Sequence, residues 1–241
     1  MGPVDRIPQA GRNPAARGQP AGVLAAALFD VDGTLADTTA LIREAITQIL
    51  QEEGISPTWE EIRAGWSLRA ADRMQLWVRD RARAEMLAQR YVERYLALQD
   101  ALIRPYPGMA ETLARLAAQG VSLGVVTSKR RASALATLGA FELERYFRVI
   151  VTEDDVATPK PDPVPLLLGA TRLGAAAPET VMVGDGDVDI RAGKAAGMRT
   201  VGALWGTIDP EALQAAHPTW VMRNPTDLLL LPWQETPGGA S

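Results

Sequence analysis

The sequence predicts an α/β protein with a doubly wound, mostly parallel sheet and a helical domain inserted near the start of the chain. From about residue 25 onward, short apolar runs alternate with helical patterns, which is typical of parallel strands covered by helices on both faces. Roughly 90 residues separate the first two apolar runs, many more than a crossover connection needs. The chain has 241 residues, of which 47% are hydrophobic, enough to bury a full core together with an insert.

The predicted core domain covers residues 23–38 and 103–233 and contains five strands. The strands lie at residues 26–31, 121–127, 147–152, 180–185 and 199–205, and each is short and ends at polar residues or glycine. Helical spacing occurs at residues 109–120, 131–140, 163–174 and 189–197, with a glycine near each C-terminal end. This order of elements predicts successive βαβ units.

Residues 39–102 form the predicted helical cap domain. Helical patterns occupy residues 41–53, 58–63, 67–79 and 82–98, and Pro57 and Gly65 interrupt them. The segment RPYPG at residues 104–108 marks the return to the core. Because the insert emerges at the carboxyl end of the first strand, where open α/β sheets bind ligands, we expect it to act as a lid.

Composition limits the partners and the chemistry. The formal net charge is -4 and implies no broad basic surface, so neither nucleic acid nor an anionic membrane is an expected partner. Without cysteine, the chain has no disulfide, thiolate zinc site or cysteine nucleophile, and this composition fits a reducing cytoplasm. Residues 1–22 are predicted to be a disordered tail, and no segment is apolar over the length of a membrane-spanning helix. The single histidine, His217, is expected at the surface.

Polar side chains gather where several of the predicted segments end. Two carboxylates follow the first strand, two hydroxyls follow the second, a lysine lies between two prolines, and three carboxylates follow a later strand. Because the carboxyl ends of parallel strands meet at one sheet edge, we expect these groups to lie together. The first segment alone could be an ordinary turn with a helix-capping acid, but all four together suit phosphoryl transfer. The residues are Asp30 and Asp32 with Gly33; Thr127 and Ser128; Lys160; and Asp185, Asp187 and Asp189.

These segments, in this order, resemble the four motifs of the haloacid dehalogenase superfamily. The matching stretches are DVDGTL at residues 30–35, Thr127 after its strand, Lys160 before Pro161, and GDGDVD at residues 184–189. The resemblance runs from about residue 25 to residue 231 and implies a Rossmann-like core. The insert is similar to the cap of the subfamily that contains phosphoglycolate phosphatases, pyrophosphatases and β-phosphoglucomutases. Because the dehalogenases of the family lack the second acid of the first motif, Asp32 indicates phosphate chemistry.

The resemblance implies a role for each of the catalytic groups. Asp30 would be the nucleophile that forms an aspartyl-phosphate, and Asp32 the acid and base that serves the leaving oxygen and the attacking water. Thr127 and the main-chain amides near Ser128 would hold the phosphoryl oxygens. Lys160 would neutralise negative charge on both the phosphate and the nucleophile.

A magnesium ion is the expected cofactor, because Mg2+ prefers oxygen ligands and retains some of its waters. Its expected ligands are Asp30, the main-chain carbonyl of Asp32, Asp185 and Asp189, the last directly or through water. Gly33 is expected to turn the chain tightly beside the substrate. Asp187 is expected to face solvent or to cap a helix, and Asp37 to serve the hinge of the cap.

The implied activity is a magnesium-dependent phosphatase that acts on a small phosphorylated metabolite, as a monomer or weak homodimer. In the family the cap recognises the leaving group, and in the cap loop at residues 64–72 Arg69 could meet a second anionic group or remain a solvated helix residue. Phosphoglycolate is the leading substrate, and pyrophosphate, a sugar phosphate or a phosphomutase reaction are the alternatives. Receiver domains of signalling carry similar groups but lack an inserted lid. Inactive phosphate-binding scaffolds usually lack the catalytic side chains.

Overall fold

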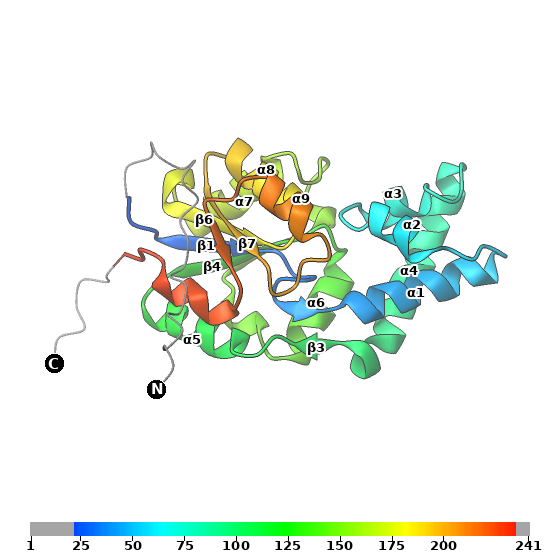
Figure 1. The fold of residues 1–241 in the computed structure, drawn as a ribbon, viewed down its shortest axis with the longest axis horizontal. Helices are drawn as coiled ribbons and strands as arrows, with labels where there is room; N and C mark the ends of the chain where they lie inside the picture. Colours follow the sequence, from blue (N-terminus) through cyan, green and yellow to red (C-terminus); the bar gives the residue numbers. More distant parts are fainter. Residues whose placement is uncertain (1–21, 235–241) are drawn as a thin grey trace, which may run out of the picture.

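A single sheet of six parallel strands lies at the centre of the core (Figure 1). The computed structural model describes residues 22–234, so the predicted tail lies outside the described residues except for Gly22. The strand order is β5-β4-β1-β6-β7-β8, which places β1 between β4 and β6. The strands are β1 Ala26–Phe29, β4 Ser122–Val126, β5 Val149–Val151, β6 Thr180–Gly184, β7 Arg199–Ala203 and β8 Trp220–Met222.

Helices cover both faces of this sheet, as the doubly wound prediction requires. Adjacent residues of a strand point to opposite faces, so Phe29 packs into the apolar layer that contains α5, whereas Leu28 packs into the layer that contains α7. Strand β6 alternates in the same way, with Val183 in the first layer and Met182 in the second. The predicted fold class is therefore confirmed. The helices of the core are α5 Met109–Ala118, α6 Arg131–Ala140, α7 Val164–Leu173, α8 Asp187–Ala195 and α9 Pro210–Ala215, with short 3-10 turns at Glu144–Tyr146, Glu153–Asp155, Ala177–Glu179 and Pro225–Leu230.

The insert consists of four helices with an apolar core of their own, beside one end of the sheet in Figure 1. They are α1 Thr39–Glu52, α2 Trp59–Ala64, α3 Ala70–Met74 and α4 Arg81–Leu102. The buried face of α1 carries Leu41, Ile42, Ala45, Ile46 and Ile49, the spacing of one helix face. A two-stranded antiparallel ribbon, β2 Ala36–Asp37 with β3 Arg104–Pro105, lies where the insert leaves and rejoins the core. The domain boundaries at residues 39 and 102 stay a prediction.

Two predicted cap helices differ clearly in extent, and α9, β8 and the ribbon of β2 and β3 were not predicted. The helix expected at residues 67–79 is wrong in length: α3 ends at Met74, and beyond it Leu76 and Trp77 bond to carbonyls three residues back, which tightens the chain into turns. Helix α4 continues past the predicted residue 98, and Gln99, one turn after the buried Tyr95, extends its buried face. Strand β8 was not predicted, and with three residues it is too short to show a strand pattern.

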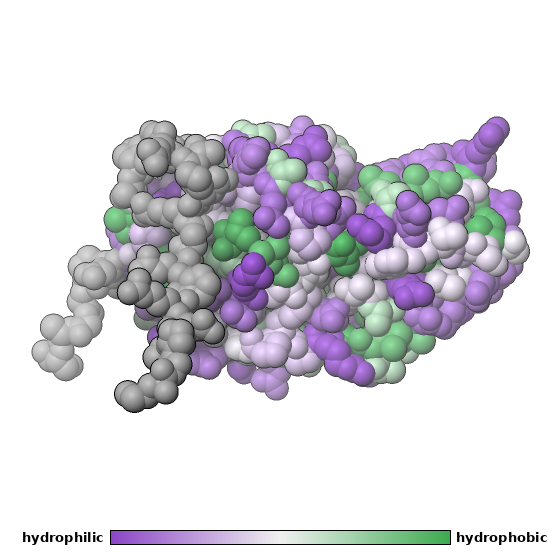
Figure 2. Space-filling model, viewed as in Figure 1, coloured by the Kyte–Doolittle hydropathy of each residue, from purple (hydrophilic) through white to green (hydrophobic). Residues whose placement is uncertain are grey.

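The visible face of the molecule is largely hydrophilic, with separate apolar patches, on both the core and the cap (Figure 2). Within residues 22–234, no helix is both long and apolar enough to span a membrane.

Candidate active site

The carboxyl ends of β1, β4 and β6 meet beneath the cap and carry most of the predicted site. Asp30 directly follows β1, Thr127 follows β4 and Asp185 follows β6. Because β1 pairs with both neighbours in parallel register, these strand ends lie next to one another. Lys160 comes from the loop before α7, and Asp189 from the first turn of α8. The topology thus brings together the residues that the sequence pattern placed at one edge.

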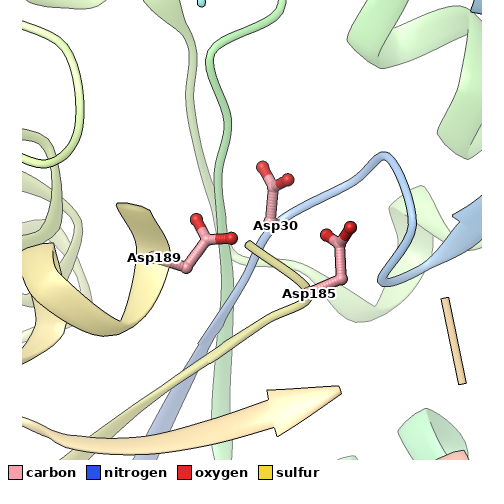
Figure 3. Close-up of side chains that lie close together, drawn as sticks. All are labelled: Asp30, Asp185 and Asp189. Carbon is pink, nitrogen blue, oxygen red and sulfur yellow. The ribbon is translucent and has the colours of Figure 1, made fainter. Parts of the chain in front are cut away.

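Three carboxylates form a compact cluster at this edge (Figure 3). One oxygen each from Asp30, Asp185 and Asp189 lies within 4.8 Å of the others. The ammonium of Lys160 bridges two of them, at 3.0 Å from Asp30 Oδ1 and 2.6 Å from Asp189 Oδ1. It also donates to the carbonyl of Val126 at 3.1 Å. The cluster therefore contains three carboxylates and one ammonium. The atoms that it offers to a metal ion are all carboxylate oxygens.

Burial sets the protonation of this cluster. It raises the pKa of Asp30 to about 6, although Lys160 works in the opposite direction and Asp189 adds to the rise. Burial also holds the pKa of Asp185 well above its usual range, and the charges of Asp189 and Asp30 add to that effect. For Lys160 burial alone would lower the pKa, but Asp189 and Asp30 raise it above its ordinary value. Burial and mutual repulsion of the carboxylates thus favour proton uptake by Asp30 and Asp185 when no metal is bound.

Glycine is required at position 33 because the Asp185 side chain lies very close to its main chain, and not only because the chain turns there. Its φ is +72, and a Cβ atom at this position would lie 2.3 Å from Asp185 Oδ2. Its amide donates to the carbonyl of Ala36 at 3.0 Å, so direct substrate binding by Gly33 stays a prediction. Next to it, the hydroxyl of Thr34 donates to Asp185 Oδ1 at 3.1 Å. The loop after β1 therefore positions Asp185 as well as carrying Asp30.

Asp32 is held by two side chains. The hydroxyl of Thr38, which precedes α1, donates to Asp32 Oδ1 at 2.8 Å. The ammonium of Lys129 lies 2.9 Å from Oδ1 and 3.1 Å from Oδ2 of the same carboxylate. The side chain of Asp32 thus lies outside the carboxylate cluster, whereas its main-chain carbonyl accepts no hydrogen bond from residues 22–234 and remains available as a ligand.

Thr127 and Ser128 lie in the loop between β4 and α6 and line the same cavity as Asp30. Thr127 is buried, its amide donates to the carbonyl of Val151 at 3.0 Å, and its hydroxyl oxygen accepts from the amide of Lys129 at 3.3 Å. Neither the amide nor the hydroxyl of Ser128 bonds to another residue of the described chain. Unused donors on the cavity wall suit the binding of phosphoryl oxygens, although these roles stay predictions.

The cap closes the site from above and leaves a cavity of about 60 Å³. Its wall on the cap side includes Trp66, Leu68, Arg73 and Tyr91. The guanidinium of Arg73 is buried and donates to three carbonyls of its own loop, from Nε to Gly65 at 2.9 Å and from Nη2 to Trp66 at 2.8 Å and Leu68 at 3.1 Å. A cavity of this size suits a small leaving group.

Arg69 lies in a smaller adjoining cavity, and its guanidinium bonds to the core. Nη1 donates to the carbonyl of Ala157 and Nη2 to that of Val156, both at 2.9 Å. Arg69 therefore bridges the cap to the core, and direct contact with a substrate stays a prediction. Asp187 is the first residue of α8 and pairs with Arg191 at its exposed surface, while Asp37 accepts a hydrogen bond from the amide of Thr39 at the start of α1.

Two site residues were missed in the sequence. Lys129 follows Thr127 and Ser128 directly, so its place at the end of a strand was the available signal. Arg73 lies four residues after Arg69, one helical turn further along the cap loop, and the pattern alone does not tell which arginine faces the cavity. His217 is exposed, as expected.

Comparison with known proteins agrees with this geometry. The sequence profile of haloacid dehalogenase-like hydrolases matches residues 27–203. A phosphoglycolate phosphatase from Yersinia pestis is 33% identical over 208 residues, covering 83% of this chain and 90% of that protein. Pyrophosphatase PpaX from Halalkalibacterium halodurans is 35% identical over 207 residues, covering 84% of this chain and 94% of that protein. The crystal structure of a hydrolase from Pseudomonas syringae has a TM-score of 0.78 at 29% identity, covering 86% of this chain and 96% of that chain.

Proposed function

The chain belongs to the haloacid dehalogenase-like hydrolases and is a phosphatase of that family, and we propose that it hydrolyses a small phosphorylated metabolite with Mg2+ and with Asp30 as nucleophile. One observation carries the proposal: Asp30, Asp185 and Asp189 share a buried space that Lys160 closes on one side. Because a carboxylate is a weak nucleophile, it needs a fixed position and masked phosphate charge, and this cluster supplies both. We place the activity in the cytoplasm, since a chain without cysteine fits a reducing compartment.

In the first half of the reaction, an oxygen of Asp30 attacks the phosphorus. A bond forms between that oxygen and the phosphorus, the bond to the leaving oxygen breaks, and Asp32 in its acid form gives the leaving oxygen a proton. The products are an aspartyl-phosphate on Asp30 and the protonated leaving group, which is glycolate from phosphoglycolate and inorganic phosphate from pyrophosphate. Lys160, at 3.0 Å from Asp30, offsets negative charge on both partners of the transfer.

In the second half, water attacks the aspartyl-phosphate. Asp32, now a carboxylate, accepts a proton from the water as the new bond to phosphorus forms and the bond to Asp30 breaks. Inorganic phosphate leaves and both acids return to their starting states. During both steps, Thr127 and the free amide of Ser128 are the groups proposed to hold the phosphoryl oxygens.

The donor set fits magnesium. All three clustered side chains offer oxygen, and burial together with the neighbouring carboxylates raises the pKa values of Asp30 and Asp185. The main-chain carbonyl of Asp32 accepts no hydrogen bond from residues 22–234. We therefore assign the metal to Asp30, Asp185, Asp189 and the carbonyl of Asp32. When bound, Mg2+ masks the charge of the phosphoryl group and orients it for in-line attack.

Phosphoglycolate is the leading candidate substrate, and pyrophosphate is the second, because relatives at similar identity carry these two names. Both compounds place a second anion beside the phosphoryl group. Arg73 lies on the cavity wall, has no carboxylate within 4.0 Å among residues 22–234, and keeps Nη1 free of hydrogen bonds to them. We propose that Arg73 meets this second anion, and that Arg69 holds the cap closed through the carbonyls of Val156 and Ala157. A sugar monophosphate would leave this cation without a matching group.

Phosphate release from a panel of phosphorylated metabolites, with and without Mg2+, tests the proposal. We expect release only in the presence of Mg2+, loss of release after addition of EDTA, and the highest kcat/KM for phosphoglycolate or pyrophosphate. Full activity in EDTA would contradict the metal assignment, and transfer of phosphate between sugar positions without release would favour a phosphomutase.

A further inference from the structure

Lys129 is a buried cation that the reaction scheme above does not use. It lies in the loop between β4 and α6, and 7% of its side chain is exposed. Its ammonium contacts both carboxylate oxygens of Asp32, at 2.9 and 3.1 Å. On another side lies the ring of Tyr95, whose centroid is 3.8 Å from the Lys129 nitrogen. The ammonium is thus held between a carboxylate of the core and an aromatic face of the cap.

Tyr95 itself is fixed between the two domains. It belongs to cap helix α4, is fully buried, and forms a 2.8 Å hydrogen bond through its hydroxyl with Thr137 of core helix α6. Thr137 donates its own proton to the carbonyl of Ser133 at 2.8 Å, which leaves the Tyr95 hydroxyl as the donor. Tyr91 packs edge-on against the ring, with centroids 6.1 Å apart. The aromatic face therefore has little freedom to move away from Lys129.

The carboxylate of Asp32 depends on this arrangement for its orientation. Among residues 22–234, its side-chain partners are Lys129 and the hydroxyl of Thr38, and Lys129 is the partner that contacts both oxygens. A group that gives a proton to the leaving oxygen and later accepts one from water must stay within hydrogen-bond reach of both. Its orientation is therefore part of its chemistry.

We propose that Lys129, held against the ring of Tyr95, positions the carboxylate of Asp32 for proton transfer. The cap thereby contributes to the catalytic acid and base through an aromatic face, in addition to covering the substrate. This inference rests on the proposed function, because it takes the proton-transfer role of Asp32 as given. Lys129 is a positioning residue here, since it acts through Asp32.

If the ion pair between Lys129 and Asp32 only stabilised the fold, its removal would have a different effect on the kinetics. Breaking a buried pair lowers stability and impairs every substrate alike, whereas loss of positioning lowers kcat/KM for those substrates whose leaving group needs a proton. p-Nitrophenyl phosphate and benzyl phosphate separate the two cases, because both are uncharged at the far end and only the benzyl alcohol is a poor leaving group. A direct contact between Lys129 and the substrate would instead change KM for both compounds.

The test measures kcat and KM of Lys129→Met on these two substrates, with melting temperature as a control for folding. The ratio kcat/KM includes only the steps up to departure of the leaving group, so the hydrolysis of the aspartyl-phosphate, which both substrates share, does not affect it. We expect kcat/KM to fall about 30- to 100-fold for benzyl phosphate and about threefold or less for p-nitrophenyl phosphate. Lys129→Arg should recover part of the loss. Tyr95→Leu should lower kcat/KM about tenfold for benzyl phosphate alone, and Tyr95→Phe, which keeps the ring, should retain most of that activity.

Asp32→Asn separates failure of the inference from failure of the proposed function. It should show the same selective loss of kcat/KM, and adding Lys129→Met to it should change kcat/KM by no more than about twofold, because the group to be positioned is already gone. If Asp32→Asn lowers kcat/KM equally for both substrates, the role in protonating the leaving group fails and the inference fails with it. If Asp32→Asn is selective but Lys129→Met lowers kcat/KM equally for both substrates, the positioning role is overturned.

Discussion

Arg73 has a charge that no carboxylate of residues 22–234 neutralises within 4.0 Å, although it lies in a wall of the active-site cavity. A charge-assisted hydrogen bond to a substrate anion would contribute about 1.5 to 3 kcal/mol. We therefore expect Arg73→Met to lower kcat/KM for phosphoglycolate about tenfold to a hundredfold and to change that for p-nitrophenyl phosphate about threefold or less. Steady-state kinetics on the two substrates measures the difference.

The control for Arg73 is the charge-retaining variant Arg73→Lys, which keeps a cation near the cavity but loses the guanidinium bonds to the loop carbonyls. It should recover part of the activity on phosphoglycolate. Equal losses on both substrates in both variants would mean that Arg73 supports the loop that contains Gly65, Trp66 and Leu68 and does not recognise an anion.

Gly33 offers a test of the close approach between the loop after β1 and Asp185. A side chain there would be strained at φ +72 and would displace the Asp185 carboxylate, whose Oδ2 lies 2.3 Å from the Cβ position. We expect Gly33→Ala to lower the free energy of unfolding by roughly 1 to 3 kcal/mol and to raise the Mg2+ concentration needed for half-maximal activity. Gly54→Ala is the matched control, because Gly54 has φ +75 and nothing within 4 Å of its Cβ position. If both variants need the same Mg2+ concentration, the contact with Asp185 has no role in metal binding.

At the scale of elements, Arg69 joins the cap to the core through two main-chain carbonyls, and Arg63 joins them through an exposed ion pair with Asp209. Exposed pairs contribute about 0.2 to 1 kcal/mol, less than partly buried bonds to a charged group. We expect Arg69→Ala to lower kcat/KM for phosphoglycolate and p-nitrophenyl phosphate by a similar factor of about 5 to 20, whereas Arg63→Ala should change either about twofold or less. A loss of kcat/KM confined to phosphoglycolate would indicate that Arg69 recognises the second anion of the substrate.

Elements with a strong pattern could be predicted from the sequence, and those fixed by tertiary contacts could not. The central strands are apolar on both faces, so the runs around Phe29 and Val183 identified them directly. Helix α3 begins at Ala70 and not at residue 67, because Arg73 bonds to carbonyls of the loop that precedes the helix, which no periodic pattern encodes. Strand β8 exists because β7 offers it a free edge, again a contact distant in sequence.

The same division holds for the site. The motif acids and Lys160 could be placed because strand ends of a parallel sheet share one edge. The contact between Lys129 and Tyr95 could not, because these residues come from a core loop and a cap helix that meet only when the cap lies on the core. For the same reason the choice between Arg69 and Arg73 needs the packing of the cap loop.

For the whole molecule, the carboxylate cluster links stability to pH and metal. Burial raises the pKa of Asp30 to about 6 and that of Asp185 above its usual range, so above about pH 4 these two acids hold more protons in the folded metal-free protein than in the unfolded chain. Their contribution to stability should therefore fall as pH rises from about 4 through these raised pKa values. Mg2+ needs ionised carboxylates and should stabilise more at pH 7.5 than at pH 5.

Thermal unfolding measures this linkage. At a Mg2+ concentration about 100 times its dissociation constant, the metal adds about 2.7 kcal/mol, which corresponds to a rise in Tm of about 5 to 10 °C at pH 7.5. We expect less than about half of that rise at pH 5 and no rise for Asp185→Asn. Equal shifts at the two pH values would show that the metal does not compete with protons for these acids.

The central claim is that Asp30 forms a covalent bond to phosphorus, and mass spectrometry of protein quenched in acid during turnover tests it most directly. With Mg2+ and substrate present, the peptide that contains Asp30 should gain one phosphoryl group, and fragmentation should place that group on Asp30. The gain should be absent without Mg2+ and in Asp30→Asn, which should also lose phosphate release while keeping its melting temperature within a few degrees. Rapid turnover with no phosphorylated peptide, together with inversion of configuration at phosphorus when a substrate with a chiral, isotopically labelled phosphoryl group is hydrolysed, would contradict the account. A single direct attack by water inverts the configuration, whereas transfer to Asp30 and then to water retains it.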